Sequence, residues 1–388
     1  MFKILTYNNI SRAGLDRFPD EQYQVGAQVD SPDALMLRSF NLHDQAIPGS
    51  LKAVGRAGAG VNNIPVPEYT QRGIPVFNAP GANSNAVAEL VIAGMLLAAR
   101  NIVPALNFVR DLTGSEESLN EQIENEKKHF AGFELSGKTL GVLGLGAIGV
   151  KVANSSAALG MKIIGFDPFM SLENAWKLTS SAEQAISIDD LTSRSDLISL
   201  HIPLNDKTKN LFNEAHIQRI KKGAILLNFS RAGVVDESAV LAALDSGALS
   251  AYVCDFPTAA LINHPRAIAL PHLGASTEEA EDNCAAMVAD QLREFLEHGT
   301  IRNSVNFPEV VVAPSGDGFR LSIANENKPG VVGHISSILG AAGLNILDLL
   351  NKSRGDYAYT LVDIHAAASE EVVEQLRAID GVLSVRVI

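Results

Sequence analysis

The sequence predicts an α/β protein in which a doubly wound parallel sheet forms the middle of the chain. A second α/β unit precedes this sheet, and a small βαββαβ domain follows it. Three observations support the prediction: a glycine-rich turn joins two apolar runs at Gly144, short apolar runs alternate with helical segments over most of the chain, and the pattern changes after Gly316. A chain of 388 residues is also long enough for two or three domains.

The first unit, from residue 1 to about 95, is expected to contain four short strands: Lys3–Tyr7, Ala34–Leu37, Lys52–Gly55 and Ile74–Phe77. A glycine-rich loop that begins with Arg56 follows the third of these strands. Such a loop can offer N–H groups to a small anion, or it can be a close-packed turn. The apolar run 85–108 predicts a long buried helix, and we attach no chemistry to the charged segment 111–130.

The stretch from Lys138 to Asp167 contains a strand, a G-x-G-x-x-G turn, a helix, a second strand and an acid. In this order they are Thr139–Leu143, Gly144–Gly149, Ile148–Leu159, Met161–Phe166 and Asp167. This succession is that of a Rossmann-type dinucleotide-binding unit.

Each residue type in this stretch has a physical reason. Gly144 permits the tight turn, Gly146 lets a pyrophosphate approach the backbone, and Gly149 lets the helix pack close to the strand. Asp167 lies 18 residues after Gly149 and can accept hydrogen bonds from ribose hydroxyls. Because Asp167 would repel a 2′-phosphate and no arginine follows it in 168–170, we expect NAD rather than NADP.

Four further apolar runs extend the alternation: Asp196–Ile202, Ala224–Phe229, Tyr252–Phe256 and Ala267–Leu270. In a doubly wound sheet, ligands bind at the carboxyl ends of the strands. We therefore single out the polar residues at these ends, which are His201, Asn228–Arg231, Asp255 and His272.

The end of the chain predicts a helix over 278–296, an irregular linker over 301–314 and then a small domain. The βαββαβ pattern of this domain consists of Phe319–Ile323, Pro329–Ala342, Ile346–Leu350, Tyr357–His365, Glu370–Ile379 and Leu383–Ile388. This order is that of a ferredoxin-like domain.

The composition excludes several function classes. Thirty-one basic and 44 acidic residues give a net charge of −13, which argues against nucleic-acid and anionic-membrane partners. Cys254 and Cys284 form neither a disulfide framework nor a metal cluster, so we predict no metal site. No signal peptide and no apolar run of about 18 residues occurs, and we expect a cytoplasmic protein.

Three motifs occur together in the order of a known family: the turn 144–149, Asn228-Phe-Ser-Arg231 followed by Val234-Val-Asp-Glu237, and the segment Pro271-His-Leu-Gly-Ala-Ser-Thr277. On these motifs the chain resembles the D-isomer-specific 2-hydroxyacid dehydrogenases over nearly its whole length. The segments 56–63 and 83–90 and the C-terminal domain resemble most the members that oxidise 3-phospho-D-glycerate to 3-phosphohydroxypyruvate, the first step of L-serine biosynthesis.

The resemblance implies a Rossmann-type NAD domain inserted in a flavodoxin-like substrate domain, with the active site in the cleft between them and an ACT domain at the end. The implied boundaries are 1–95 and 281–305 for the substrate domain, 96–280 for the NAD domain, 306–316 for a linker and 317–388 for the ACT domain. It also implies a homodimer or homotetramer, regulated by an amino acid, with L-serine as the candidate effector.

The resemblance further implies site residues. Those for NAD are Gly144, Gly146, Ala147, Ile148, Gly149, Asp167, His201, Phe229, Ser230, Arg231, Asp255 and His272; those for substrate are Arg56, Gly58, Ala59, Arg231 and His272; those for the effector are Asn325, Asn327 and Asn345. Arg231 would bind the substrate carboxylate or keto oxygen through its planar fork. His272 would be the general base that takes the hydroxyl proton while hydride passes to NAD.

Three features depart from the family pattern. No Asp or Glu occurs between Asp255 and Glu278, so Ala259 or Ala260 stands where relatives have a glutamate that pairs with the catalytic histidine. We therefore expect a slower enzyme whose reductive reaction favours acid pH, because a carboxylate stabilises an imidazolium. Ala232 replaces the usual glycine after the arginine, and many relatives have a histidine at position 325. Arg38, Arg56 and Arg72 are candidates for the substrate phosphate or are ordinary surface arginines.

Two alternatives follow from these features. The same residues can serve a reductase of hydroxypyruvate, glyoxylate or another 2-keto acid. The missing glutamate instead favours a catalytically weak regulator that binds NAD and an amino acid.

Overall fold

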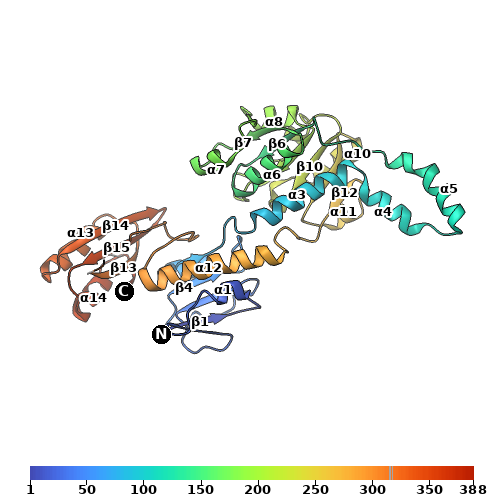
Figure 1. Ribbon diagram of the computed structural model, residues 1–388. Coiled ribbons are helices and arrows are strands. Elements are labelled where there is room, and N and C mark those ends of the chain that lie inside the picture. Colours follow the sequence, from blue (N-terminus) through green and yellow to red (C-terminus); the bar gives the residue numbers. More distant parts are fainter. Residues whose placement is uncertain (314–315, 317) are drawn as a thin grey trace. The chain divides into compact units, whose positions relative to one another are not determined.

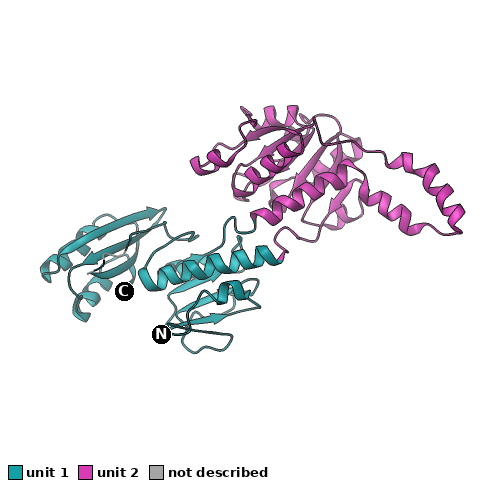
Figure 2. Cartoon of the chain, viewed as in Figure 1, with its two compact units in different colours: residues 1–83, 278–388 teal, residues 84–277 magenta. Residues whose placement is uncertain are grey.

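The computed structural model describes residues 1–313, 316 and 318–388. The chain divides into two compact units (Figure 2). Unit 1 comprises 1–83 and 278–388, and unit 2 comprises 84–277. Unit 2 is therefore an insertion in unit 1.

Unit 2 is built on a seven-stranded sheet with the order β12-β11-β10-β9-β6-β7-β8, in which every pair is parallel (Figure 1). Its strands are β6 (Thr139–Leu143), β7 (Lys162–Phe166), β8 (Glu183–Gln184), β9 (Leu197–Leu200), β10 (Ala224–Asn228), β11 (Leu249–Cys254) and β12 (Ala267–Ala269). The strand order reverses between β6 and β9, and this is the switch point at which doubly wound sheets bind ligands.

Helices cover both faces of this sheet. They are α3 (Ser84–Ala99), α6 (Ala147–Ala158), α7 (Leu172–Lys177), α8 (Ile188–Arg194), α9 (Glu214–Ile217), η2 (Ala232–Val234), α10 (Glu237–Ser246) and α11 (Ala259–Ile262). Apolar residues of α3 and α6 form one buried core with the strands, and those of α8, α9 and α10 form another on the opposite face. The central strands β6, β9 and β10 are buried on both faces, which is why they were recognisable as short apolar runs.

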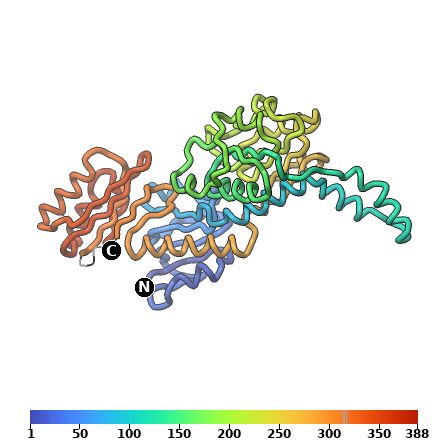
Figure 3. The backbone as a smooth tube through the Cα atoms, turned by 45° about the horizontal axis from the view of Figure 1, so that its top comes forward, coloured from blue at the N-terminus to red at the C-terminus, as the bar shows by residue number. Residues whose placement is uncertain are grey.

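The charged segment 111–130 forms part of an arm that projects from unit 2 (Figures 1 and 3). The arm consists of α4 (Ile102–Asp111), α5 (Glu116–Glu126) and η1 (Lys127–Phe130). Its three elements contain no buried residue. Among the described residues no single helix is long and apolar enough to cross a membrane; α3 and α4 reach that length only together, and they bend by 65° where they meet.

The first part of unit 1 has a five-stranded parallel sheet with the flavodoxin-like order β2-β1-β3-β4-β5. Its elements are β1 (Phe2–Thr6), α1 (Arg12–Leu15), β2 (Tyr23–Gly26), β3 (Ala34–Leu37), β4 (Ala53–Arg56), α2 (Val66–Gln71), β5 (Val76–Phe77) and α12 (Glu278–His298). Ala34 and Met36 of β3 belong to the buried core that contains α12, and Leu35 and Leu37 belong to the core on the other face of the sheet.

The tail of unit 1 is a four-stranded antiparallel sheet with the order β14-β15-β13-β16. Its elements are β13 (Phe319–Glu326), α13 (Val331–Ala341), β14 (Ile346–Arg354), β15 (Tyr357–Ile364), α14 (Glu370–Arg377) and β16 (Val382–Val387). Helices α13 and α14 cover one face of this sheet. Three residues of the other face, Ala324, Tyr359 and Leu361, belong to the same buried core as α12. The predicted fold class is confirmed in all three parts.

Candidate active site

The glycine turn lies between β6 and α6, at the switch point of the sheet. Gly144 has a φ of +92°, and a Cβ on this residue would lie 2.5 Å from the carbonyl oxygen of His201. A Cβ on Gly149 would lie 1.9 Å from the carbonyl oxygen of Gly144, so the start of α6 can approach β6 only as glycine. A Cβ on Gly146 would meet no atom within 4 Å, which leaves the backbone before Ala147 and Ile148 open to a ligand.

Asp167 follows β7 and holds the turn in place. Its Oδ2 accepts a hydrogen bond of 2.8 Å from the N–H of Leu145, and its Oδ1 accepts one of 2.8 Å from the N–H of Phe169. A carboxylate has further lone pairs, which ribose hydroxyls can use. Asp167 thus has the position and the chemistry that an adenosine ribose requires.

His201 follows β9 on the other side of the switch point. The backbone N–H of His201 donates a hydrogen bond of 2.7 Å to the carbonyl oxygen of Leu143, and the imidazole Nε2 lies 2.8 Å from Ser199 Oγ. Burial lowers the pKa of His201 to about 4, so the imidazole is neutral at physiological pH. Among the described residues, nothing hydrogen-bonds its buried Nδ1.

The turn after β10 presents Arg231. Phe229 and Ser230 are buried, whereas Arg231 is exposed and its Nη1 donates to the carbonyl oxygen of Ser230 at 2.7 Å. Asn228 has no exposed surface. Its Oδ1 accepts hydrogen bonds from the N–H of Ser230 at 3.1 Å and from Ser230 Oγ at 2.9 Å. Its Nδ2 donates to the carbonyl oxygen of Arg231 at 3.0 Å, which closes the turn.

The turn after β12 presents His272. This residue is exposed and has a φ of +57°, an uncommon conformation for a residue other than glycine. Asp255, at the end of the neighbouring strand β11, accepts the N–H groups of Leu273 and Gly274, both at 2.7 Å. Asp255 is only 2% exposed, so its carboxylate is directed at the backbone of this turn.

The imidazole of His272 contacts an aromatic ring. The Phe256 ring lies 5.2 Å from it, edge to face, at an interplanar angle of 66°. Within the part of the chain that the structure describes, His272 makes no ion pair with a carboxylate. The structure therefore adds an aromatic neighbour that the sequence did not indicate, since aromatic contacts leave no motif.

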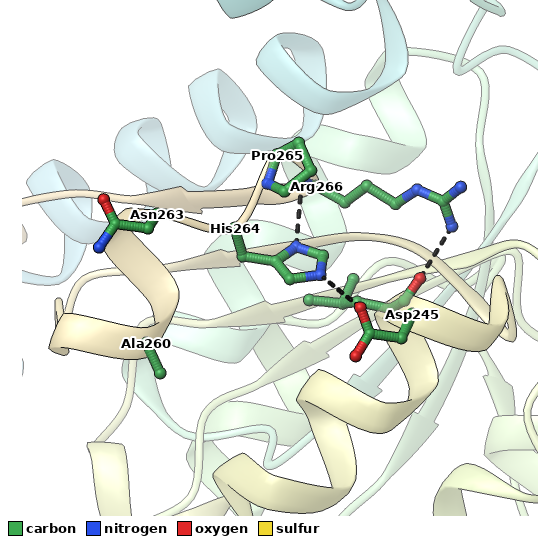
Figure 4. Close-up of a pocket in the computed structure, with 7 residues that line it drawn as sticks. Asp245, Ala260, Asn263, His264, Pro265 and Arg266 are labelled. Atoms are coloured by element: carbon green, nitrogen blue, oxygen red, sulfur yellow. Dashed lines mark hydrogen bonds and ion pairs between the residues drawn. The ribbon is translucent and has the colours of Figure 1, made fainter.

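Ala259 and Ala260 begin α11, and both are exposed. Ala260 lines a pocket of about 340 Å³ together with Asp245 and His264, and Figure 4 shows that His264 bridges Asp245 and the backbone of Arg266. This pocket is formed by the segments that precede β11 and β12, at the amino ends of these strands. A glutamate at position 260 would therefore have His264 near it, whereas Ala259 does not line this pocket.

In unit 1, Arg56 ends β4, and its Nε donates to the carbonyl oxygen of Arg38 at 3.0 Å. A Cβ on Gly58 would lie 2.3 Å from Arg56 Nη1, so the loop folds closely over the guanidinium. The carbonyl oxygen of the next residue, Ala59, accepts a hydrogen bond of 2.6 Å from Asn78 Nδ2. The loop is thus both close-packed and led by a cation.

The three arginines proposed for a substrate phosphate do not form one cluster. Arg38 lies beside Arg56 and makes an ion pair of 2.6 Å with Glu281, at the start of α12. Arg72 instead follows α2 and donates to the carbonyl oxygen of Ile47 at 3.4 Å. The pairing of Arg38 with Glu281 was missed from the sequence because 243 positions separate the two residues (281 − 38).

The three asparagines of the tail lie at two ends of its sheet. Asn325 pairs with Ala358 near the start of β15, and Asn327 donates to Gly355 in the adjoining turn. Asn345 precedes β14, whose first residue pairs with Ile364 at the other end of β15. Six residues of strand, about 20 Å, separate these ends. One copy of the tail therefore brings Asn325 and Asn327 together but not Asn345.

Two family models match the chain. Residues 96–274 match the D-isomer specific 2-hydroxyacid dehydrogenase, NAD binding domain, and residues 321–384 match the AHAS small subunit-like ACT domain. The first match contains the glycine turn, Asp167, Arg231 and His272.

Three proteins illustrate the relationship. The D-3-phosphoglycerate dehydrogenase of Methanocaldococcus jannaschii is 40% identical over 73% of this chain, which spans only 53% of that relative's length. The D-3-phosphoglycerate dehydrogenase of Haemophilus influenzae is 35% identical, with 87% of this chain and 81% of that protein covered. The crystal structure of NAD⁺-bound 3-phosphoglycerate dehydrogenase from Entamoeba histolytica matches with a TM-score of 0.62 at 26% identity, covering 79% of this chain and 98% of that one. The chain therefore belongs to the D-isomer-specific 2-hydroxyacid dehydrogenases and is a homologue of the D-3-phosphoglycerate dehydrogenases, as its three motifs predict.

Proposed function

We propose that the protein oxidises 3-phospho-D-glycerate to 3-phosphohydroxypyruvate, with NAD as hydride acceptor. One observation carries the proposal: the glycine turn, Asp167, Arg231 and His272 all follow strands of one parallel sheet, at their carboxyl ends. The match of residues 96–274 to an NAD-binding domain supports the cofactor, and relatives at 35% and 40% identity support the substrate.

The residues present fit NAD. The open backbone at Gly146 and the first N–H groups of α6 suit a pyrophosphate, and the carboxylate of Asp167 suits a ribose diol. Bound NAD supplies the acceptor for the hydride. His201 is neutral and brings no positive charge to the turn.

The chain's own residues handle the proton and the substrate's charge. An imidazole nitrogen of His272 takes the proton of the C2 hydroxyl while the C2 hydride leaves, and the C2–O bond becomes a keto group. Arg231 binds the substrate carboxylate through two N–H groups of its fork. In the opposite direction the imidazolium of His272 returns the proton. Because no carboxylate among the described residues forms an ion pair with His272, we expect reduction to be favoured at acid pH.

The remaining assignments are also proposals. Arg56 and the loop to Ala59 are assigned to substrate binding, since they place N–H groups and a cation together. We assign a homo-oligomer in which a second copy supplies Asn345 to an amino-acid site at Asn325 and Asn327, with L-serine as the candidate effector. A cytoplasmic location is in keeping with two cysteines that are buried and unbridged.

The test is NADH consumption by the purified protein with phosphohydroxypyruvate, hydroxypyruvate and glyoxylate, from about pH 5.5 to pH 8.5, the range over which an imidazole titrates. We expect turnover with the phosphorylated substrate, rising toward acid pH and lowered by L-serine. Turnover with hydroxypyruvate or glyoxylate but not the phosphorylated acid would assign a different 2-keto acid reductase. Binding of NADH without turnover of any of the three would assign a regulator.

A further inference from the structure

Two buried polar side chains hold the two turns that present Arg231 and His272. Asp255 accepts hydrogen bonds from two backbone N–H groups of the turn after β12. Asn228 both accepts and donates hydrogen bonds within the turn after β10. The N–H of Asp255 also lies 3.3 Å from the carbonyl oxygen of Asn228. The two residues therefore connect the ends of neighbouring strands beneath the candidate catalytic pair.

The turn at His272 needs an external anchor. A positive φ on a residue with a side chain is unfavourable and persists only when neighbouring groups enforce it. The N–H of His272 closes onto Leu270 at 3.0 Å, and the next two N–H groups both point at the carboxylate of Asp255. Successive N–H groups that converge on one anion form a rigid arrangement.

The turn at Arg231 is anchored in the same way. Asn228 uses Oδ1 for two groups of Ser230, and its Nδ2 reaches both the carbonyl oxygen of Arg231 and Tyr252 Oη, the latter at 3.3 Å. The side chain at position 228 must donate and accept hydrogen bonds at the same time. An asparagine amide can do both, whereas an aspartate or a leucine of similar size cannot.

We propose that Asp255 and Asn228 are positioning residues: Asp255 fixes the backbone that aims His272, and Asn228 fixes the backbone that aims Arg231. Among the described residues His272 forms no ion pair with a carboxylate, and the Phe256 ring lies 5.2 Å from its imidazole. The two hydrogen bonds to Asp255 therefore orient the turn that carries this imidazole. The proposal rests on the proposed roles of His272 and Arg231.

The first experiment compares Asp255→Asn with a matched control. An amide can accept only one of the two N–H groups, so the turn loses one bond and gains a donor facing a donor. We expect kcat for keto-acid reduction to fall at least about 10-fold, and by a larger factor than the affinity for NADH. The control is Asp196→Asn, because Asp196 accepts the N–H of Thr139 at 2.8 Å at the opposite, amino end of the same sheet. It should leave kcat unchanged.

A mutant cycle tests whether Asp255 acts through His272. In the His272→Ala background, Asp255→Asn should reduce the residual kcat by less than about twofold, because the group that it positions is gone. A reduction equal to that in the wild-type background would mean that Asp255 acts directly on cofactor or substrate, and it would overturn the proposal. Equal losses of kcat in Asp255→Asn and Asp196→Asn would overturn it as well.

Gly274→Ala provides a milder variant should Asp255→Asn not fold. The added Cβ would lie 3.1 Å from Asp255 Oδ2, and it disturbs the contact while the charge is kept. We expect the same direction of change in kcat with a smaller size. An unchanged kcat in this variant would contradict the role of the contact.

Asn228 is tested by the division between KM and kcat. Asn228→Ala should raise the KM for the keto acid more than it lowers kcat, since Arg231 binds the substrate in both the ground and transition states. Asn228→Gln carries the same amide, and we expect it to recover part of the lost affinity. A fall in kcat with KM unchanged would contradict the assignment.

A spectroscopic measurement separates this proposal from the proposed function. The imidazole resonances of His272, assigned by their loss in His272→Ala, should shift in Asp255→Asn and not in Asp196→Asn, whether or not the protein turns over any keto acid. Wild-type protein without turnover would contradict the proposed function alone. Unshifted His272 resonances in Asp255→Asn would contradict the positioning role alone.

Discussion

Two regions of the molecule use buried charged side chains to hold backbone groups. One is the carboxyl edge of the sheet in unit 2, and the other is the junction between the end of α12 and the tail of unit 1. At the junction the guanidinium of Arg320 has its full set of hydrogen-bond partners, whereas the edge leaves some polar groups of the described residues without one. At the junction, Arg320 is 5% exposed and donates all five of its N–H groups. Two go to Asp363 at 2.6 and 2.8 Å, and three go to the carbonyl oxygens of His298, Val312 and Ala313 at 3.0–3.1 Å.

The tail also caps the last turn of α12, whose final carbonyl groups have no partner within the helix. Arg386 donates to Phe295 and Leu296, at 3.2 and 3.0 Å, and its guanidinium lies 4.4 Å from the Phe295 ring centroid. Tyr359 Oη donates to the carbonyl oxygen of Gly299 at 2.8 Å. The tail sheet is therefore a structural part of unit 1.

The edge of unit 2 leaves several groups available. Among the described residues nothing hydrogen-bonds the buried Nδ1 of His201, and Arg231 and His272 are exposed. Groups that are fully paired stabilise a fold, while groups that are held in place without a full set of partners can bind a ligand. The two regions therefore differ in what a substitution should change: stability at the junction, and activity or acid sensitivity at the edge.

The largest effect is expected from breaking the junction with Arg320→Met. This substitution leaves Asp363 buried without the guanidinium and removes the donors to three carbonyl groups. We expect the free energy of unfolding to fall by about 3–5 kcal/mol, measured by urea unfolding. The double variant Arg320→Met/Asp363→Leu should recover most of the loss, because no buried charge remains. A loss below about 1 kcal/mol for the single variant would contradict the junction's role.

The second prediction concerns acid sensitivity at the edge of unit 2. The pKa of His201 is lowered from 6.5 to about 4 by burial, so the unfolded chain takes up a proton at this residue before the folded chain does. Its contribution to stability is intact above pH 6.5 and is lost as the pH falls toward 4, at about 1.4 kcal/mol per pH unit. His201→Gln should reduce this slope in unfolding measurements, whereas His129→Gln on the exposed arm should not. Equal slopes in both variants would count against a buried neutral imidazole.

The comparison also explains which features could be predicted from the sequence. The β6–α6–β7 segment was predictable because its glycines are required by contacts within one turn, such as that between Gly149 and Gly144. The edge strand β2 (Tyr23–Gly26) was missed because it is short and only partly buried, so it gives no apolar run. Arg320 and Asp255 act through backbone groups far away in the chain, and no local pattern encodes such contacts. Asn345 was grouped with Asn325 by resemblance, although strand pairing places it at the other end of the sheet.

The third prediction adds a carboxylate intended as a partner for His272. Ala259→Glu places a carboxylate at the start of α11, four residues after Asp255, where it can stabilise the imidazolium of His272. We expect kcat for the keto acid to rise by up to about 10-fold and its pH optimum to move upward. Ala260→Glu is the matched control, because Ala260 lines the pocket of His264 and Asp245 (Figure 4). No gain in either variant would mean that the missing glutamate does not limit turnover.

The smallest effect is expected from removing one neutral hydrogen bond at the junction. Tyr359→Phe deletes the donor to Gly299 and leaves the ring in the core, so the free energy of unfolding should fall by about 1 kcal/mol. Burial also raises the pKa of Tyr359 to about 12, so the folded state keeps its phenol protonated where the unfolded chain has ionised it. The stability that depends on this phenol is full below pH 10 and is lost as the pH rises toward 12. Unfolding measured across this range should therefore depend less on pH in Tyr359→Phe than in the wild-type protein. Tyr69, whose pKa burial also raises to about 12, should maintain part of the alkaline slope in both proteins, so a variant slope equal to the wild-type one would contradict the buried phenol at the junction.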